Sequence, residues 1–158
     1  MKTKYNILLL FGLLFLDQLS KYLVLSNLAL HEKIVVIEDF FSIFYVRNDG
    51  AAFSMLEGKL WLFYIITIAG LIVVYKIYQD SKSNFLKTIC FILLAGILGN
   101  FIDRIIHQEV IDFLSFNIFG YNFAIFNFAD VYICVALFMF VVDVLFLERG
   151  RENEKNND

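Results

Sequence analysis

Four long apolar stretches alternate with shorter polar segments along the chain. They lie near residues 5–25, 60–77, 85–106 and 126–147. A helix of about 20 residues crosses the roughly 30 Å hydrocarbon core of a bilayer, at about 1.5 Å per residue. The pattern therefore predicts an all-α integral membrane protein with four transmembrane helices, built as one membrane-embedded domain over residues 1–148.

Basic residues beside the apolar stretches predict the orientation of the chain, because cytoplasmic loops carry an excess of Lys and Arg. One side carries Lys2, Lys4, Lys76, Lys82, Lys87, Arg149, Arg151 and Lys155, and the other carries Lys21, Lys33, Arg47, Lys59 and Arg104. The first group is the larger. We therefore expect both termini in the cytoplasm, with residues 149–158 as a charged cytoplasmic tail.

Two segments on the opposite side of the membrane have the composition of β-strands. Residues 26–59 contain IVVIEDFFSIFYV, which is rich in β-branched and aromatic residues. Residues 118–125 alternate around Phe119-Gly120-Tyr121-Asn122, a possible hairpin turn. We expect a small extracytoplasmic β-sheet that rests on the outer membrane face.

Composition supports a membrane protein and excludes several other classes. The chain is 60% hydrophobic and contains 19 Phe and no Pro. A soluble fold of this size could not bury so much apolar surface.

The start of the chain resembles a cleavable signal peptide, but the apolar run continues into Asp17, Gln18 and Lys21 without a small-x-small cleavage site. We expect it to be retained as a helix, and no basic run suggests a nucleic-acid partner.

Polar residues gather at one end of the predicted helices. Asn100, Asp103 and Arg104 share a helix face at spacings of three and four residues, and Asp130 lies about one turn inside the fourth helix. Counting residues at 1.5 Å each also places Asp17 in the outer half of the bilayer. Ionisable groups inside a membrane are costly and therefore favour a functional interpretation.

Two of the carboxylates suit acid–base chemistry. Asp112 lies between Ile111 and Phe113, and Asp130 lies near the start of its helix. Two neighbouring carboxyls in such surroundings cannot both ionise easily, so one keeps a proton and the other can activate water. We therefore interpret Asp112 and Asp130 as an aspartyl catalytic pair. The alternative for each residue alone is a carboxylate that caps a helix or a loop.

The other charged residues favour structural roles. Asp17 and Lys21 are one helical turn apart, a favourable spacing for an ion pair that is structural or orients a substrate. Asp103 is next to Arg104, and we expect an ion-paired structural role for it. The segment Asn48-Asp49-Gly50-Ala51-Ala52-Phe53 is either a common turn or a place where small residues allow close approach to a bound chain.

Together these motifs resemble the lipoprotein signal peptidase family, the type II signal peptidases of bacteria. The matching segments, in family order, are Asp17-Gln18-Leu19-Ser20-Lys21, Asn48-Asp49-Gly50-Ala51-Ala52-Phe53, Gly99-Asn100-Phe101-Ile102-Asp103-Arg104, Val110-Ile111-Asp112-Phe113 and Phe126-Asn127-Phe128-Ala129-Asp130. Each motif alone is weak, but the ordered set is specific. Ser20 replaces the more usual Thr and preserves the hydroxyl.

The resemblance implies roles for individual residues. Asp112 and Asp130 would be the catalytic aspartates of a membrane endopeptidase that needs no metal or other cofactor. The supporting or substrate-binding residues would be Asp17, Lys21, Asn48, Gly50, Asn100, Asp103, Arg104 and Asn127. The substrates would be prolipoproteins whose cysteine carries diacylglycerol, cleaved just before that cysteine at the outer face of the bacterial cytoplasmic membrane, in contact with membrane lipids.

Two other functions are compatible with intramembrane carboxylates. A small transporter or proton relay would use buried Asp, Lys and Arg, although the polar groups leave no path toward the cytoplasm. A structural assembly factor would use them only to hold its helices together. Cleavage of a lipidated precursor distinguishes the peptidase from both.

Overall fold

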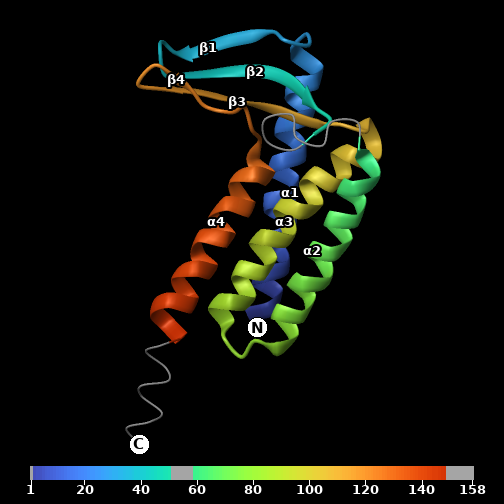
Figure 1. The fold of residues 1–158 in the computed structure, drawn as a ribbon, viewed down its shortest axis with the longest axis vertical. Coiled ribbons are helices and arrows are strands. Elements are labelled where there is room, and N and C mark those ends of the chain that lie inside the picture. The colour runs from blue at the N-terminus through green and yellow to red at the C-terminus, as the bar shows by residue number, and fades with distance from the viewer. Residues whose placement is uncertain (1, 51–58, 149–158) are drawn as a thin grey trace, which may run out of the picture.

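The computed structural model describes residues 2–50 and 59–148 (Figure 1). In chain order its elements are the helix α1 (Lys2–Asn27), the strands β1 (Lys33–Ile37) and β2 (Phe41–Asn48), the helices α2 (Leu60–Asp80) and α3 (Asn84–His107), the strands β3 (Val110–Ile118) and β4 (Tyr121–Asn122), the helix α4 (Phe128–Val142) and the π-helix η2 (Asp143–Glu148). The predicted tail at 149–158 lies outside the described residues.

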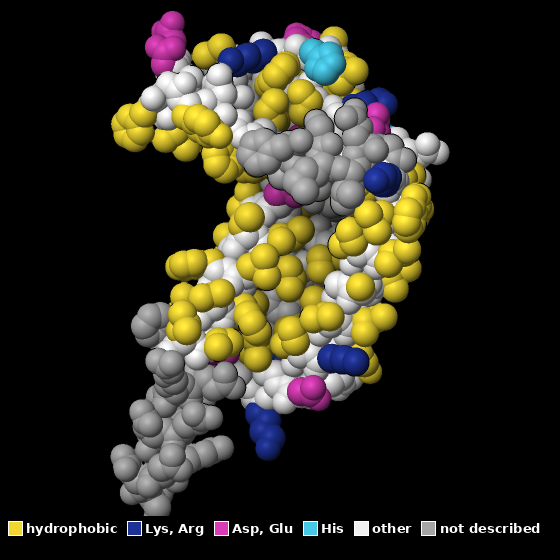
Figure 2. All heavy atoms as spheres, in the orientation of Figure 1, with side chains coloured by type: hydrophobic (Ala, Val, Ile, Leu, Met, Phe, Trp, Pro, Cys, Tyr) yellow, Lys and Arg dark blue, Asp and Glu magenta, His cyan; other side chains and the backbone are white. Residues whose placement is uncertain are grey.

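Within the described residues, four helices are long and apolar enough to cross a membrane, as the hydrophobic pattern predicted. They stand side by side, and the connection between α2 and α3 lies at the end of the bundle away from the strands (Figure 1). Apolar side chains cover the visible flank of the bundle (Figure 2). Charged side chains lie mainly toward the two ends of that face. The fourth helix begins at Phe128, two residues later than expected, because Asn127 caps it and Phe126 bridges to Leu114.

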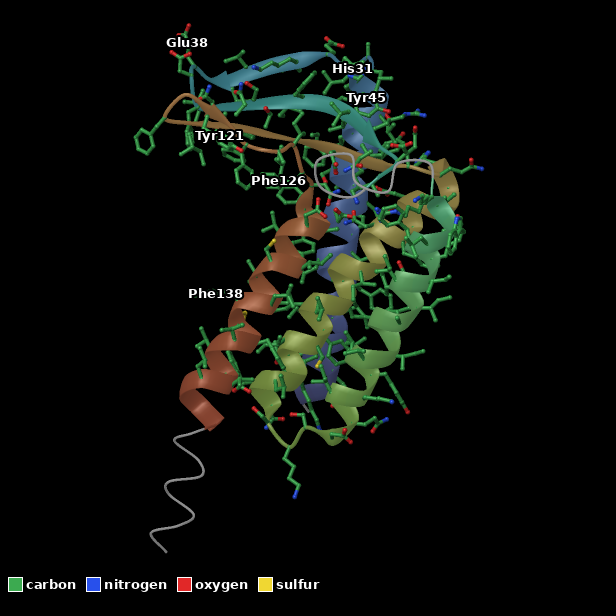
Figure 3. All side chains as sticks on the ribbon, viewed as in Figure 1. His31, Glu38, Tyr45, Tyr121, Phe126 and Phe138 are labelled. Atoms are coloured by element: carbon green, nitrogen blue, oxygen red, sulfur yellow. The ribbon has the colours of Figure 1, made fainter. Side chains whose placement is uncertain are left out.

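The predicted sheet is present and lies across one end of the bundle (Figure 1). Its four strands are antiparallel and follow the order β1-β2-β3-β4. The expected hairpin turn is confirmed between β3 and β4, where Phe119 and Gly120 have φ of 52° and 85°. Positive φ at both central residues matches the twist of a two-residue hairpin. Tyr121 and Glu38 lie at the free end of the sheet, away from the helices (Figure 3).

A small apolar core joins the sheet to the bundle. Val24 near the end of α1 packs with Tyr45 on β2 and with Ile111, Phe113 and Leu114 on β3. Phe126 lies where the chain passes from β4 into α4 and covers part of this core (Figure 3). Because Ile111 and Phe113 alternate with Asp112 along β3, packing of the first two directs the carboxylate to the opposite side of the strand.

Glycines let α3 approach its neighbours closely. A Cβ added at Gly96 would lie 2.5 Å from the backbone oxygen of Ala129 and 2.6 Å from the Cγ1 atom of Ile133. A Cβ at Gly99 would lie 2.6 Å from the Oδ2 atom of Asp17. Small residues at these positions allow backbones of membrane helices to pack together. The packing therefore sets the distance between α3 and the first turn of α4.

We expect Gly96→Ala to destabilise the protein, because the rigid backbone of α4 cannot move away from the added methyl group. Overpacking of this kind costs about 1–3 kcal/mol. Gly12→Ala on α1 is a matched control, since nothing lies within 4 Å of its added Cβ. Thermal unfolding in detergent should show a lower midpoint for Gly96→Ala and an unchanged or higher one for Gly12→Ala. Equal midpoints would contradict the tight α3–α4 contact.

Candidate active site

Asp112 is held at the junction of the sheet and the bundle. Its side chain is 3% exposed. The Asn48 Nδ2 atom donates to its Oδ2 atom at 2.9 Å, and the Asn127 Nδ2 atom donates to its Oδ1 atom at 2.7 Å. Val46 on β2 pairs with Asp112 on β3, so Asn48, two residues after Val46, is the diagonal neighbour of Asp112 on the same face of the sheet. The strand register therefore brings the amide to the carboxyl.

Asp130 lies in the first turn of α4 and forms a capping box with Asn127. The Asn127 Oδ1 atom accepts from the backbone N–H of Asp130 at 3.1 Å, and the Oδ2 atom of Asp130 accepts from the backbone N–H of Asn127 at 3.1 Å. Such a box satisfies two backbone donors that a helix start would leave unpaired. Asp130 therefore caps its helix, as the alternative interpretation expected. The capping box uses only its Oδ2 atom, so the Oδ1 atom can bond other residues of the site.

Two asparagine side chains connect the aspartates. The Asn127 Nδ2 atom donates both to Asp112 and, at 3.1 Å, to the Oδ1 atom of Asn100. The Nδ2 atom of Asn100 donates to the Oδ1 atom of Asp130 at 2.7 Å. The carboxyls predicted to act together are therefore joined by a continuous hydrogen-bonded chain, although they come from a strand and a helix.

A buried ion cluster lies directly behind this chain. The Lys21 Nζ atom is 2.9 Å from the Oδ2 atom of Asp17 and 2.9 Å from the Oδ2 atom of Asp103. It also donates to the Oδ1 atom of Asn100 at 3.1 Å. The predicted pairing of Asp17 with Lys21 is present, and the cluster links α1 to α3.

The expected pairing of Asp103 with Arg104 is wrong, because Asp103 pairs with Lys21. Consecutive residues of a helix point about 100° apart, so their side chains do not face each other. Arg104 instead donates to the backbone oxygens of Asn100 at 3.4 Å and Gly50 at 3.3 Å. Its guanidinium carbon lies 4.3 Å from the centroid of the Phe63 ring.

The predicted Asn48–Phe53 motif is described only as far as Gly50. The Oδ1 atom of Asn48 accepts from the backbone N–H of Gly50 at 3.0 Å, which closes a short turn at the end of β2. Its amide is then directed to Asp112, and the Gly50 carbonyl to Arg104. The remaining residues of the motif, 51–53, lie outside the described residues.

Burial and charge both act on Asp112. Burial and, after it, the neighbouring charge of Asp130 together raise the pKa of the carboxyl from 3.8 to about 7, against the lowering effect of the amides of Asn48 and Asn127 and of the Lys21 charge. A carboxyl with this pKa holds its proton at neutral and lower pH. The site thus contains one carboxyl suited to donate a proton and a second one, Asp130, that bonds Asn100 and the backbone of Asn127.

Three residues of the site were not predicted individually. Gln18 donates to the carboxylates of Asp17 and Asp103 at 3.1 Å each, and Phe63 and Tyr64 contact Arg104 from α2. Gln18 lies within the first motif, so its position beside Asp17 was a usable signal. The start of α2 carries no polar pattern that would have indicated Phe63.

Comparisons with known proteins identify the family of the chain. Residues 9–146 match the model of the family described as signal peptidase (SPase) II. The chain belongs to the signal peptidase II family. It is therefore a protease and, with its four apolar helices, a multi-pass membrane protein. A transporter function is not favoured by this assignment.

Curated relatives match over most of their length. The chain is 40% identical over 141 residues to the lipoprotein signal peptidase of Bacillus subtilis (strain 168), covering 88% of this chain and 91% of the relative. It is 39% identical over 151 residues to the lipoprotein signal peptidase of Staphylococcus haemolyticus (strain JCSC1435), covering 92% and 96%.

Solved structures share the fold. One bacterial membrane enzyme determined by the in meso method at 2.3 Å resolution has a TM-score of 0.85 and 36% identity, over 90% of this chain and 88% of that one. A second, at 1.9 Å resolution, has a TM-score of 0.83 and 36% identity, over 90% and 94%. The architecture of helices and sheet is thus shared with membrane enzymes.

Proposed function

We propose that the protein is an aspartic endopeptidase that removes signal peptides from diacylglyceryl-modified prolipoproteins, cutting just before the lipid-bearing cysteine. One observation carries the assignment of the catalytic residues: Asp112 bonds Asn127, Asp130 bonds Asn100, and the two asparagine side chains bond each other at the junction of sheet and bundle. Family membership supports the type of substrate, since the relatives are lipoprotein signal peptidases.

The chemistry uses the pair as an acid and a base. The ionised carboxylate takes a proton from water, and the water oxygen attacks the carbonyl carbon of the scissile peptide bond. The protonated carboxyl donates a hydrogen bond to the carbonyl oxygen and then gives its proton to the amine as the C–N bond breaks. Arg104, which lies near both carboxyls, supplies positive charge toward the developing negative charge.

The supporting residues hold this geometry. Asn48, Asn100 and Asn127 orient the two carboxyls, and the turn at Gly50 positions Arg104. Asp17, Lys21 and Asp103 form the buried cluster that fixes the first turn of α4 and the start of β3. We assign these residues to support of the site, with neither a metal nor another cofactor in the reaction.

We place the site and the sheet at the extracytoplasmic face of the bacterial cytoplasmic membrane. The sheet and the aspartates share one end of the bundle, and the connection between α2 and α3, beside Lys76, Lys82 and Lys87, lies at the other end (Figure 1). A site at the membrane surface suits a substrate that enters through its signal helix and carries a lipid on the cysteine.

Cleavage by the purified protein tests the proposed function. A diacylglyceryl-modified precursor should be cut to a lipid-bearing product that begins with cysteine, as measured by mass spectrometry of both fragments. A transporter or an assembly factor would leave the precursor intact. Failure of folded protein to cut it, or a cut elsewhere, would contradict the proposal.

We expect both termini to face the cytoplasm. The positive-inside rule assigns the end with Lys76, Lys82 and Lys87 to that side. Reporter fusions after residue 158 should be active only when the reporter functions in the cytoplasm, and a fusion within the β1–β2 turn at Asp39 should show the opposite behaviour. The reversed pattern would overturn the topology.

A further inference from the structure

Arg104 lies beside the catalytic pair, and within residues 2–50 and 59–148 it forms no ion pair. Its charge interacts with Asp130 and Asp112. Its guanidinium donates to the backbone oxygens of Asn100 at 3.4 Å and of Gly50 at 3.3 Å. Both distances exceed the usual range of about 2.7–3.2 Å for an N–H···O hydrogen bond. Hydrogen bonds therefore hold the guanidinium only loosely.

The ring of Phe63 provides a further contact for this cation. The Cζ atom of Arg104 lies 4.3 Å from the centroid of the Phe63 ring. A guanidinium within about 6 Å of an aromatic centroid is attracted to the negative face of the ring, and the attraction grows where water is excluded. Phe63 is 7% exposed, so this contact is shielded from solvent. The ring thus holds the charged end of Arg104 by electrostatic attraction as well as by packing.

The first turn of α2 is arranged so that two consecutive residues contact Arg104 on α3. The hydroxyl of Tyr64 donates to the backbone oxygen of Arg104 at 3.2 Å, and the Tyr64 ring packs edge to face against Phe101. Trp61, in the same turn, is exposed. Tyr64 therefore fixes the backbone of Arg104, while Phe63 contacts its side chain.

The ring differs from the two hydrogen-bond acceptors in where it comes from. The carbonyl of Asn100 belongs to the same helix as Arg104, and the carbonyl of Gly50 belongs to a turn after β2. Phe63 belongs to a neighbouring helix. Side chains held by helices are positioned more precisely than those held by loops. The contact with Phe63 is therefore the one best able to set the direction of the guanidinium.

We propose that Phe63 is a positioning residue that holds the guanidinium of Arg104 beside the catalytic pair through a cation–π contact. This role deepens the proposed function and rests on it. In that scheme Arg104 acts on the developing negative charge, and Phe63 acts only through Arg104. A cation that is already aligned needs no reorientation when the charge develops. Loss of the contact should therefore lower kcat and leave KM unchanged.

Fluorinated phenylalanines in place of Phe63 separate the electrostatic contact from packing. Each added fluorine weakens the negative face of the ring and changes its shape little, so the attraction for a cation falls in steps. We expect kcat on the lipidated precursor to fall in the order phenylalanine, mono-, di- and trifluorophenylalanine, by about tenfold over the series. KM and the unfolding midpoint in detergent should stay the same.

The same substitutions at Phe91 provide the matched control. Phe91 also lies on α3 and packs edge to face against Tyr78. In the described part of the chain, the rings that carry a cation are those of Tyr78 and Phe63. The series at Phe91 should leave kcat unchanged. A flat series at Phe63, or an equal decline at both positions, would overturn the proposal.

A double-mutant cycle tests whether Phe63 acts through Arg104. Phe63→Leu should lower kcat about tenfold in the wild-type background but less than about twofold in Arg104→Gln, where the contact is already absent. A merely structural role would give the same loss in both backgrounds, which would overturn the proposal. Where Arg104→Gln is too slow to measure, the fluorine series decides alone.

Failure of this role and failure of the proposed function give different results. Wild-type protein that cuts the lipidated precursor at the expected bond but shows a flat fluorine series would remove only the role of Phe63. Folded wild-type protein that leaves the precursor intact would overturn the proposed function, and the role of Phe63 would fall with it.

Discussion

Asp112→Asn and Asp130→Asn should each abolish cleavage of a lipidated precursor while the protein stays folded in the membrane. Each substitution removes either the acid or the base, and general acid–base catalysis contributes about 10²–10⁴-fold per group. We expect initial rates to fall at least about a thousandfold. Rates are measured with purified enzyme and diacylglyceryl-modified substrate under the same detergent conditions.

The pH dependence of stability provides the control for Asp112→Asn. The pKa of this carboxyl is raised from 3.8 to about 7, chiefly by burial, so the folded protein holds a proton that the unfolded chain has lost between these values. The contribution to stability is fully present below pH 3.8 and is lost as the pH rises through about 7. Asparagine cannot ionise, and the variant should be at least as stable as the wild type at pH 8. Activity near the wild-type rate in either variant would remove that residue from the mechanism.

The diacylglyceryl group of the substrate should raise kcat/KM by about 100-fold or more over the same peptide with an unmodified cysteine. Asp130 lies in the first turn of α4, close to the end of a membrane-spanning helix. A lipid anchor would hold the scissile bond at that depth and convert a free encounter into a positioned one. A factor of 100 corresponds to about 3 kcal/mol, well within what positioning can supply.

The comparison requires both substrates in the same bilayer or detergent, with matched peptide sequences. A peptide that carries one acyl chain is a useful intermediate, because it separates simple partitioning into the micelle from recognition of the whole lipid. Equal kcat/KM for the lipidated and unmodified peptides would show that the enzyme does not recognise the lipid. The peptide sequence would then have to account for specificity.

The hydrophobic pattern was sufficient to predict the helices and the sheet. Four apolar stretches of spanning length can hardly form anything else in a membrane. At the hairpin Phe119-Gly120, the usable signal was the glycine, which readily adopts one of the two positive φ values that the turn needs. Boundaries were less predictable. The start of α4 depended on a cap at Asn127 and on the bridge between Leu114 and Phe126, both of which involve contacts with β3.

The polar residues of the site were predictable as a group, but their partners were not. Spacing along one helix put Asp103 next to Arg104, whereas the true partner Lys21 lies 82 positions earlier on α1. Only the packing of α1 against α3 brings this lysine to Asp103. The linkage of the aspartates through Asn127 and Asn100 likewise depends on the register of β3 against the first turn of α4.

The central claim is that Asp112 and Asp130 share a single proton and use it to cut a lipid-anchored peptide. The pH–rate profile of the wild-type enzyme on the lipidated precursor tests this most directly. We predict a bell-shaped kcat/KM that falls on the alkaline side with an apparent pKa near 7, the value of the buried Asp112, and falls again in acid as the second carboxyl is protonated. A rate that rises through pH 7 to an alkaline plateau would indicate a base of another type and would contradict the aspartate pair.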